Sequence, residues 1–115
     1  GDAATRGAIG HAVHNALSPH PETHTFLHGS KVGYGLLVQE KLLGHDADYE
    51  ELRDYLLAQE QPTSLADFGV SRDVVEELAS RTAKEELCRL LRPEVTGDQL
   101  VHAITRNEAT SVSTT

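Results

Sequence analysis

Five of the chain's seven histidines fall within one stretch, between residues 11 and 28. Imidazole is the commonest metal ligand among side chains, and Zn²⁺ or Fe²⁺ sites that do chemistry take two or three protein ligands and leave a position open. His11 and His14 are three residues apart, so on a helix they share a face. His28 follows His11 by 17 residues, which is enough for the chain to reverse direction. The spacing therefore predicts two successive helices that bring His11 and His28 to one divalent ion.

The same histidines also have a purely structural interpretation. Most histidines in proteins are surface residues or hydrogen-bonded core residues, and spacing alone leaves both interpretations open for His11 and His28. The pattern is less specific than a CxxC pair or an HExxH motif. No Asp or Glu lies within a helical turn of His11 on its face, so the chain does not clearly supply a third ligand. The structural interpretation is preferred for His20, His24, His45 and His102.

Two helices are expected to carry this stretch. Apolar residues at three- and four-residue steps predict a helix over residues 3–17, and a second over His28–Leu43 with Gly44 as its stop. The two prolines at 19 and 21 break the chain between them. Gly33 and Gly35 disfavour a helix interior, so we expect a ligand or another helix to come close there.

Capping patterns predict helices in the rest of the chain. Asp48 and Glu51 have capping-box spacing and predict a helix over Tyr49–Gln59, with Leu52, Tyr55 and Leu56 facing inward. A short turn capped by Thr63 or Ser64 and stopped by Gly69 is expected next. Ser71 should cap a helix that runs on, or breaks and resumes, through Leu91, and Thr96 with Gln99 should open the last one.

Composition narrows the fold class and the partners. The 115 residues are enough for one domain, and with 38% hydrophobic but only 4% aromatic residues they favour an all-α helical bundle over a sheet. We place the helical metal-binding domain at residues 1–108 and a flexible tail at 109–115. The net charge of −8 argues against nucleic acid, and no apolar run reaches membrane-spanning length. A lone cysteine, Cys88, fits a reducing cytosol, so a cytoplasmic location is predicted.

The chain contains no methionine and begins Gly-Asp-Ala-Ala. Removal of an initiator methionine is one explanation. The other is that the sequence is a piece of a longer protein, entered part-way through its first helix. The motifs described next favour the second explanation.

Two motifs in the histidine-rich stretch resemble the iron-containing (group III) alcohol dehydrogenase and glycerol dehydrogenase family. They are His11-Ala12-Val13-His14-Asn15 and His28-Gly29-Ser30-Lys31-Val32, continued by Leu37-Val38-Gln39, in the family's order and spacing. Between them Glu22-Thr23 matches a turn element, and the stretch from Pro62 to Gly69 is similar to a later connection. Gly10, Ala16 and Ser30 depart from the usual residues, but none of these changes removes a ligand.

This resemblance implies the later part of a glycerol dehydrogenase-like (dehydroquinate synthase-like) helical domain. It implies Zn²⁺ or Fe²⁺ bound by His11, by His28 and by an Asp from upstream sequence, with His14 beside the metal to orient substrate or relay protons. NAD(P) would be bound mainly by an N-terminal dinucleotide-binding portion that is absent from this chain.

Two functions follow as expectations. The first is the C-terminal metal-binding segment of an NAD(P)-dependent dehydrogenase that oxidises a hydroxyl of a polyol such as glycerol, or of a hydroxy acid, in a homo-oligomer. This segment alone should be inactive. The alternative is a non-catalytic helical binding or oligomerisation module without a cofactor domain, whose broad apolar second helix should then be covered by self-association.

Overall fold

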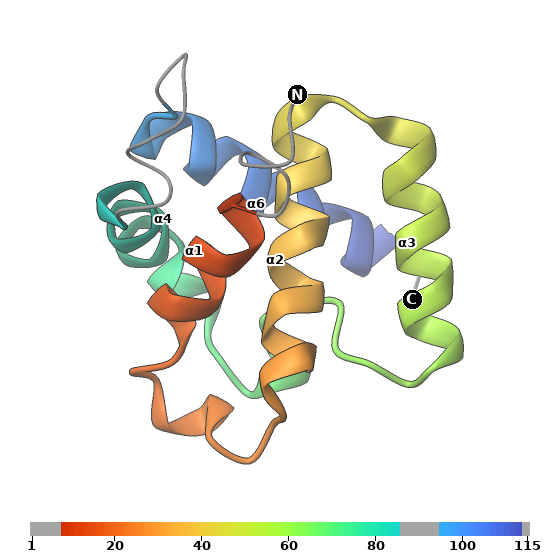
Figure 1. Ribbon diagram of the computed structural model, residues 1–115, viewed down its shortest axis with the longest axis horizontal. Coiled ribbons are helices and arrows are strands. Elements are labelled where there is room, and N and C mark those ends of the chain that lie inside the picture. Colours follow the sequence, from red (N-terminus) through yellow and green to blue (C-terminus); the bar gives the residue numbers. More distant parts are fainter. Residues whose placement is uncertain (1–7, 86–94, 114–115) are drawn as a thin grey trace.

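A computed structural model describes residues 8–85 and 95–113, and within these residues it contains helices and no strand. The predicted all-α fold is confirmed (Figure 1). None of the described helices is both long and apolar enough to span a membrane. The α-helices are α1 (Ala8–Leu17), α2 (His28–Leu43), α3 (Asp46–Ala58), α4 (Val75–Lys84) and α6 (Gly97–Ser113). Short 3₁₀ turns occupy Pro21–Thr23, Ala66–Phe68 and Arg72–Val74.

Helix α2 runs through the centre of the bundle, between α1 and α3 (Figure 1). It also packs on α6, while α4 closes the bundle by packing on both α1 and α6. The apolar surface that the alternative function expected to be self-associated is therefore largely internal to the chain, although Leu43 stays 49% exposed. The main core is made by buried side chains from α1, α2, α4 and α6, among them Ile9, Val13, Leu17, Tyr34, Val38, Leu78, Leu100 and Ile104.

Helices α1 and α2 touch through their backbones where Gly10 faces Gly35. A Cβ atom added to Gly35 would lie 2.8 Å from the Cα of Gly10, which is closer than real contacts allow. A Cβ added to Gly33 would meet Leu56 of α3 at 3.2 Å. Both glycines therefore lie where another helix comes close, one of the two explanations that the sequence offered.

The predicted bounds of α2 agree with the structure. Its C-cap residue is Gly44, with φ of 73°, and its backbone N–H donates to the carbonyls of Glu40 and Lys41. Only glycine adopts this left-handed conformation at little cost, so the helix stops there and α3 can begin two residues later. The first helix is described from Ala8, and residues 3–7 of its predicted range lie outside the described residues.

The prediction for α3 was wrong in its start and in one residue of its inward face, since Leu52 and Leu56 pack inward but Tyr55 does not. The helix begins at Asp46, and its N-cap residue is His45, which makes no side-chain capping bond, so Asp48 and Glu51 form no capping box. Asp46 and Asp48 lie in the first turn, where negative charge complements the helix dipole. Tyr49, Arg53 and Leu56 are buried, whereas Tyr55 is 61% exposed. The true apolar stripe starts at Tyr49, which the prediction used only as a boundary.

The capping predictions for Ser71 and for the pair Thr96 and Gln99 are confirmed by hydrogen bonds. Ser71 accepts a hydrogen bond from the Asp73 N–H, and Thr96 and Gln99 cap each other reciprocally at 2.9 and 3.2 Å. Helix α4 is described as far as Lys84, and its predicted continuation through Leu91, with Cys88, lies outside the described residues. Helix α6 runs to Ser113, so it enters the segment predicted as a tail, and the division at residue 108 stays a prediction.

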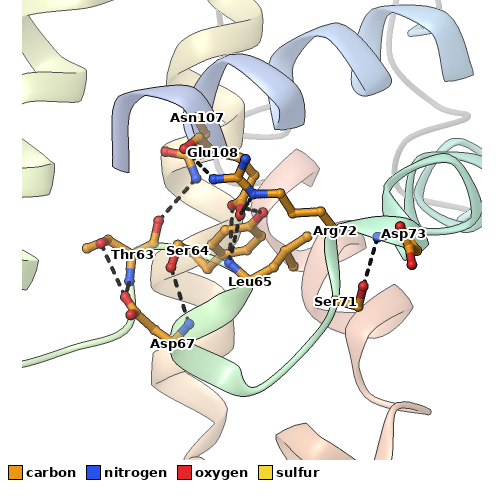
Figure 2. Close-up of polar contacts among 10 residues, drawn as sticks. Thr63, Ser64, Leu65, Asp67, Ser71, Arg72, Asp73, Asn107 and Glu108 are labelled. Atoms are coloured by element: carbon orange, nitrogen blue, oxygen red, sulfur yellow. Dashed lines mark hydrogen bonds and ion pairs between the residues drawn. The ribbon is translucent and has the colours of Figure 1, made fainter. Parts of the chain in front are cut away.

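A buried polar cluster ties the loop after α3 to the end of α6 (Figure 2). The carboxylate of Glu108, 3% exposed, accepts hydrogen bonds from the Leu65 N–H and the Tyr34 hydroxyl. Asn107 donates to the Thr63 carbonyl and accepts from the Tyr49 hydroxyl. Burial raises the pKa of Glu108, and it raises the pKa of Tyr34 well above the ordinary value. These partners fix the loop and α3 against the central helices.

Candidate functional site

Three imidazoles converge where α1 meets the first turn of α2. The ring centroids of His14 and His28 are 4.1 Å apart in an edge-to-face arrangement, and those of His11 and His28 are 6.4 Å apart. His11 and His14 share a face of α1 because they are three residues apart, and His28 is the first residue of α2. The Gly10–Gly35 contact brings the two helices close enough for the rings to meet. The cluster is open, since His11 and His28 are exposed and His14 is half-buried.

The surroundings of His14 shift the pKa of its imidazole. Desolvation lowers the pKa of His14, and nearby positive charge from His28, Lys31 and His11 adds to this, while a hydrogen bond to Asn15 acts in the opposite direction. The neutral imidazole is thus favoured. A neutral imidazole is the form that accepts a proton or binds a metal.

The donor set fits a divalent metal with one adjustment. Zinc binds imidazole nitrogen at about 2.0–2.1 Å, so the centroids of two rings on a tetrahedral ion would lie roughly 5 Å apart. The His11 and His28 rings would have to close by about 1 Å, a shift that two exposed side chains can make by rotation. In the described residues no third carboxylate or imidazole joins these two within ligating distance. The expected third ligand from upstream sequence stays a prediction.

The remaining histidines are not part of this cluster. His24 Nε2 is 2.9 Å from the Ser18 carbonyl, and His20 lies 3.7 Å from the Glu77 carboxylate. His102 is exposed on α6. His45 Nδ1 is 2.9 Å from a Glu40 carboxylate oxygen. The structural interpretation preferred for these four stays a prediction.

A separate group of potential ligands lies at the turn between α2 and α3. Donor atoms of Glu40, His45 and Asp48 all fall within 4.8 Å of one another, and no other group of three in the described part of the chain does so. His45 and Asp48 are exposed.

Sequence reasoning missed two residues beside the imidazoles. Asn15 Oδ1 is 3.1 Å from His14 Nδ1, and its Nδ2 lies 3.4 Å from a carboxylate oxygen of Glu85. Asn15 stands within the first motif, so its position was a signal that could have been used. Glu85 is 70 residues away and belongs to no motif, so only the fold reveals it.

Comparison with known proteins gives a consistent set of relatives. Hydroxycarboxylate dehydrogenase A of Escherichia coli (strain K12) is 49% identical over 70 residues, which are 61% of this chain and 19% of that protein. Glycerol dehydrogenase of Pseudomonas putida is 40% identical over 68 residues, 58% of this chain and 19% of that protein. No family model matches the chain.

The fold has a counterpart among solved structures. The crystal structure of a probable glycerol dehydrogenase from Sinorhizobium meliloti 1021 matches with a TM-score of 0.75 and 29% sequence identity. The match covers 91% of this chain and 31% of that one. The chain thus spans about a fifth of the length of the two curated relatives named above.

Proposed function

Because this chain belongs, as a partial segment, to the iron-containing alcohol dehydrogenase and glycerol dehydrogenase family, we propose that it is the C-terminal metal-binding part of an NAD(P)-dependent dehydrogenase. The enzyme would oxidise a hydroxyl of a polyol such as glycerol, or of a hydroxy acid. The observation that carries the proposal is the meeting of three imidazoles from two separate motifs at the α1–α2 junction.

His11 and His28 are the residues that would hold the metal. They are exposed, they come from successive helices, and neutral imidazole suits zinc and iron alike. A divalent ion held there would supply Lewis-acid polarisation of the substrate hydroxyl. The third ligand would be an Asp from upstream sequence, and NAD(P) would be bound by the dinucleotide-binding portion of the same enzyme.

His14 would handle a proton at this site. Its ring contacts His28, and its lowered pKa keeps it neutral, so it can accept a proton released when a substrate hydroxyl is oxidised. Its half-buried position places that acceptor at the edge of the cluster rather than in bulk water. A substrate hydroxyl at His28 would therefore have a proton acceptor within reach.

No observation favours the alternative of a non-catalytic module. That alternative expects a wide apolar face on the second helix to be covered by self-association, whereas this face packs against α1, α3 and α6 within the chain. The expectation of a homo-oligomer stays a prediction.

Metal binding by the 115-residue chain tests the proposal. We expect His11→Ala and His28→Ala each to weaken Zn²⁺ binding by more than the ten- to hundredfold typical of losing an outer-shell partner. The matched control is His45→Ala, which removes an imidazole from the Glu40–His45–Asp48 group and should leave this binding unchanged. Titration calorimetry measures the affinity. Unchanged affinity with both His11 and His28 replaced would contradict the proposal.

Activity is the second readout. In a protein that joins this segment to its dinucleotide-binding portion, either substitution should abolish NAD(P)-linked oxidation of glycerol or of a 2-hydroxy acid, because a first-sphere ligand is lost. Replacing His14 by Ala should lower kcat and retain the metal. Assays with both substrate classes would also separate polyol from hydroxy-acid specificity.

A further inference from the structure

The side chain of Asn15 connects the imidazole cluster to the end of α4. Its amide oxygen Oδ1 is 3.1 Å from His14 Nδ1, and its amide nitrogen Nδ2 donates to Glu85 Oε2 at 3.4 Å. Glu85 is the C-cap residue of α4 and is half-buried. One amide group is therefore in contact with a carboxylate on one side and with an imidazole on the other.

This arrangement fixes which way the amide faces. An ionised carboxylate only accepts hydrogen bonds, so the NH₂ end of Asn15 must face Glu85. The oxygen end then faces His14, and because an amide oxygen also only accepts, the proton between the two residues must sit on His14 Nδ1. A neutral imidazole carries a single N–H, so its Nε2 is left with a free lone pair.

Besides its edge-to-face contact with His28, the His14 ring has one further hydrogen-bond contact, which is weaker and does not reverse this assignment. Ser18 Oγ lies 3.5 Å from Nε2, and its only hydrogen is donated to the His14 carbonyl at 2.9 Å. A proton on Nε2 would thus have an acceptor at 3.5 Å, against 3.1 Å for a proton on Nδ1. The charged carboxylate behind Asn15 strengthens the shorter contact further.

We propose that Glu85 is a positioning residue, which acts through Asn15 to hold His14 in its Nδ1–H tautomer and leaves Nε2 as the basic atom of the imidazole cluster. The inference rests on the proposed function for its catalytic meaning, because a proton acceptor beside His28 needs its lone pair on a defined atom. The hydrogen bonds themselves do not depend on that function.

The tautomer can be measured directly. Long-range ¹H–¹⁵N correlation spectra of the ¹⁵N-labelled, chelator-treated 115-residue chain distinguish a protonated ring nitrogen from an unprotonated one. At about pH 8.5, where an ordinary histidine is neutral, His14 should show a protonated Nδ1 and an unprotonated Nε2. The histidine side chain in water prefers the opposite tautomer, so a protonated Nε2 in the unmodified chain would overturn the proposal.

Substitutions at the far end of the contact give the sharper test. Glu85→Lys places a donor where an acceptor stood, so the Asn15 amide should turn over and the two nitrogens of His14 should exchange their shift types. Adding Asn15→Asp to Glu85→Lys should restore the original pattern, because a carboxylate at position 15 accepts from both neighbours. Glu76→Lys, an exposed site in the first turn of α4, is the matched control and should change nothing.

The outcomes separate this inference from the proposed function. No exchange in Glu85→Lys, with the helical circular dichroism retained, overturns the role of Glu85 whatever the enzyme does. An exchange of tautomer together with a loss of kcat, restored in the double variant, supports both. An exchange that leaves kcat unchanged supports the hydrogen-bond assignment and counts against the proton-handling role given to His14.

Discussion

Two polar clusters in this small bundle are built in opposite ways. Around Glu108, a carboxylate, two phenol hydroxyls, an amide and backbone groups are buried and satisfy one another. At the α1–α2 junction, three imidazoles meet at the surface, and His28 has both His11 and His14 as ring neighbours. Burying polar groups costs stability unless they are hydrogen-bonded, so the first cluster maintains the fold. In the second, the described residues place His11 and His28 at the surface, where a binding site requires its ligand atoms to be accessible.

The largest contrast is expected from truncating one member of each cluster. Glu108→Ala leaves the Leu65 N–H and the Tyr34 hydroxyl buried without their acceptor, and we expect it to lower the free energy of unfolding by about 3 kcal/mol. The ion pair with Arg72 adds little, because Arg72 is half-exposed and 3.8 Å away. His11→Ala and His28→Ala should each change stability by less than about 0.5 kcal/mol. Urea denaturation measures the stability of all three variants. Equal losses of stability would contradict the distinction between the two clusters.

A smaller effect is expected where the two helices that carry the imidazoles cross. Gly35→Ala places a methyl group against the Gly10 backbone, so α1 and α2 must separate, at a cost of about 2 kcal/mol. The separation should also weaken Zn²⁺ binding, because His11 and His28 move apart. Gly29→Ala is the control in the same helix: nothing lies within 4 Å of the added Cβ, and a gain of about 0.5 kcal/mol is expected. Thermal unfolding and calorimetry would report both effects.

Removing one hydroxyl should have a still smaller effect. Tyr49→Phe deletes the hydrogen bond to Asn107 but keeps the buried ring, so a loss of about 1 kcal/mol is expected. Tyr55→Phe, on the exposed side of the same helix, should fall within about 0.5 kcal/mol of zero. If neither substitution changed the free energy of unfolding, packing alone would stabilise the cluster.

The smallest effect is a dependence on pH. Burial raises the pKa of Glu108 above its ordinary value of 4.5, so the folded chain holds this proton more tightly than the unfolded chain. That contribution is complete below pH 4.5 and is lost as the pH rises through the folded-state value. The stability of the parent chain relative to Glu108→Gln should therefore fall over this range and then level off. If this stability difference rose over the same pH range, the pKa of Glu108 would instead be lowered in the folded chain.

Much of the fold could be predicted from the sequence. The bounds of α2 follow from its apolar pattern and from Gly44, and the Thr96–Gln99 pair correctly marked the start of α6. The start of α3 was misplaced because Asp46 and Asp48 are equally good residues for a first helical turn, and local pattern cannot choose between them. Tertiary packing on α2 decides which face turns inward, and it buries Tyr49 rather than Tyr55.

The two clusters differ in how far their residues could be predicted from the sequence. The meeting of His11 and His28 followed from motif spacing together with a family resemblance, although metal binding there remains a proposal. Asn107 and Glu108 went unnoticed because polar residues on a helix are usually assigned to the solvent side. Their spacing was a usable signal, since they stand seven and eight residues after Leu100 on the stripe that includes Ala103 and Ile104. No sequence pattern of this kind pointed to Glu85.

The direct backbone contact of Gly10 with Gly35 has a consequence for how this region tolerates change. The Gly35 Cα faces the main chain of Gly10 directly, so the separation of the two helices there depends on main-chain atoms, which have no rotamers to exchange. Core residues elsewhere in the bundle can be swapped for others of similar volume without altering that separation. We therefore expect the spacing of the imidazoles to be insensitive to conservative changes in the hydrophobic core, and to be altered by a single methyl group at position 35.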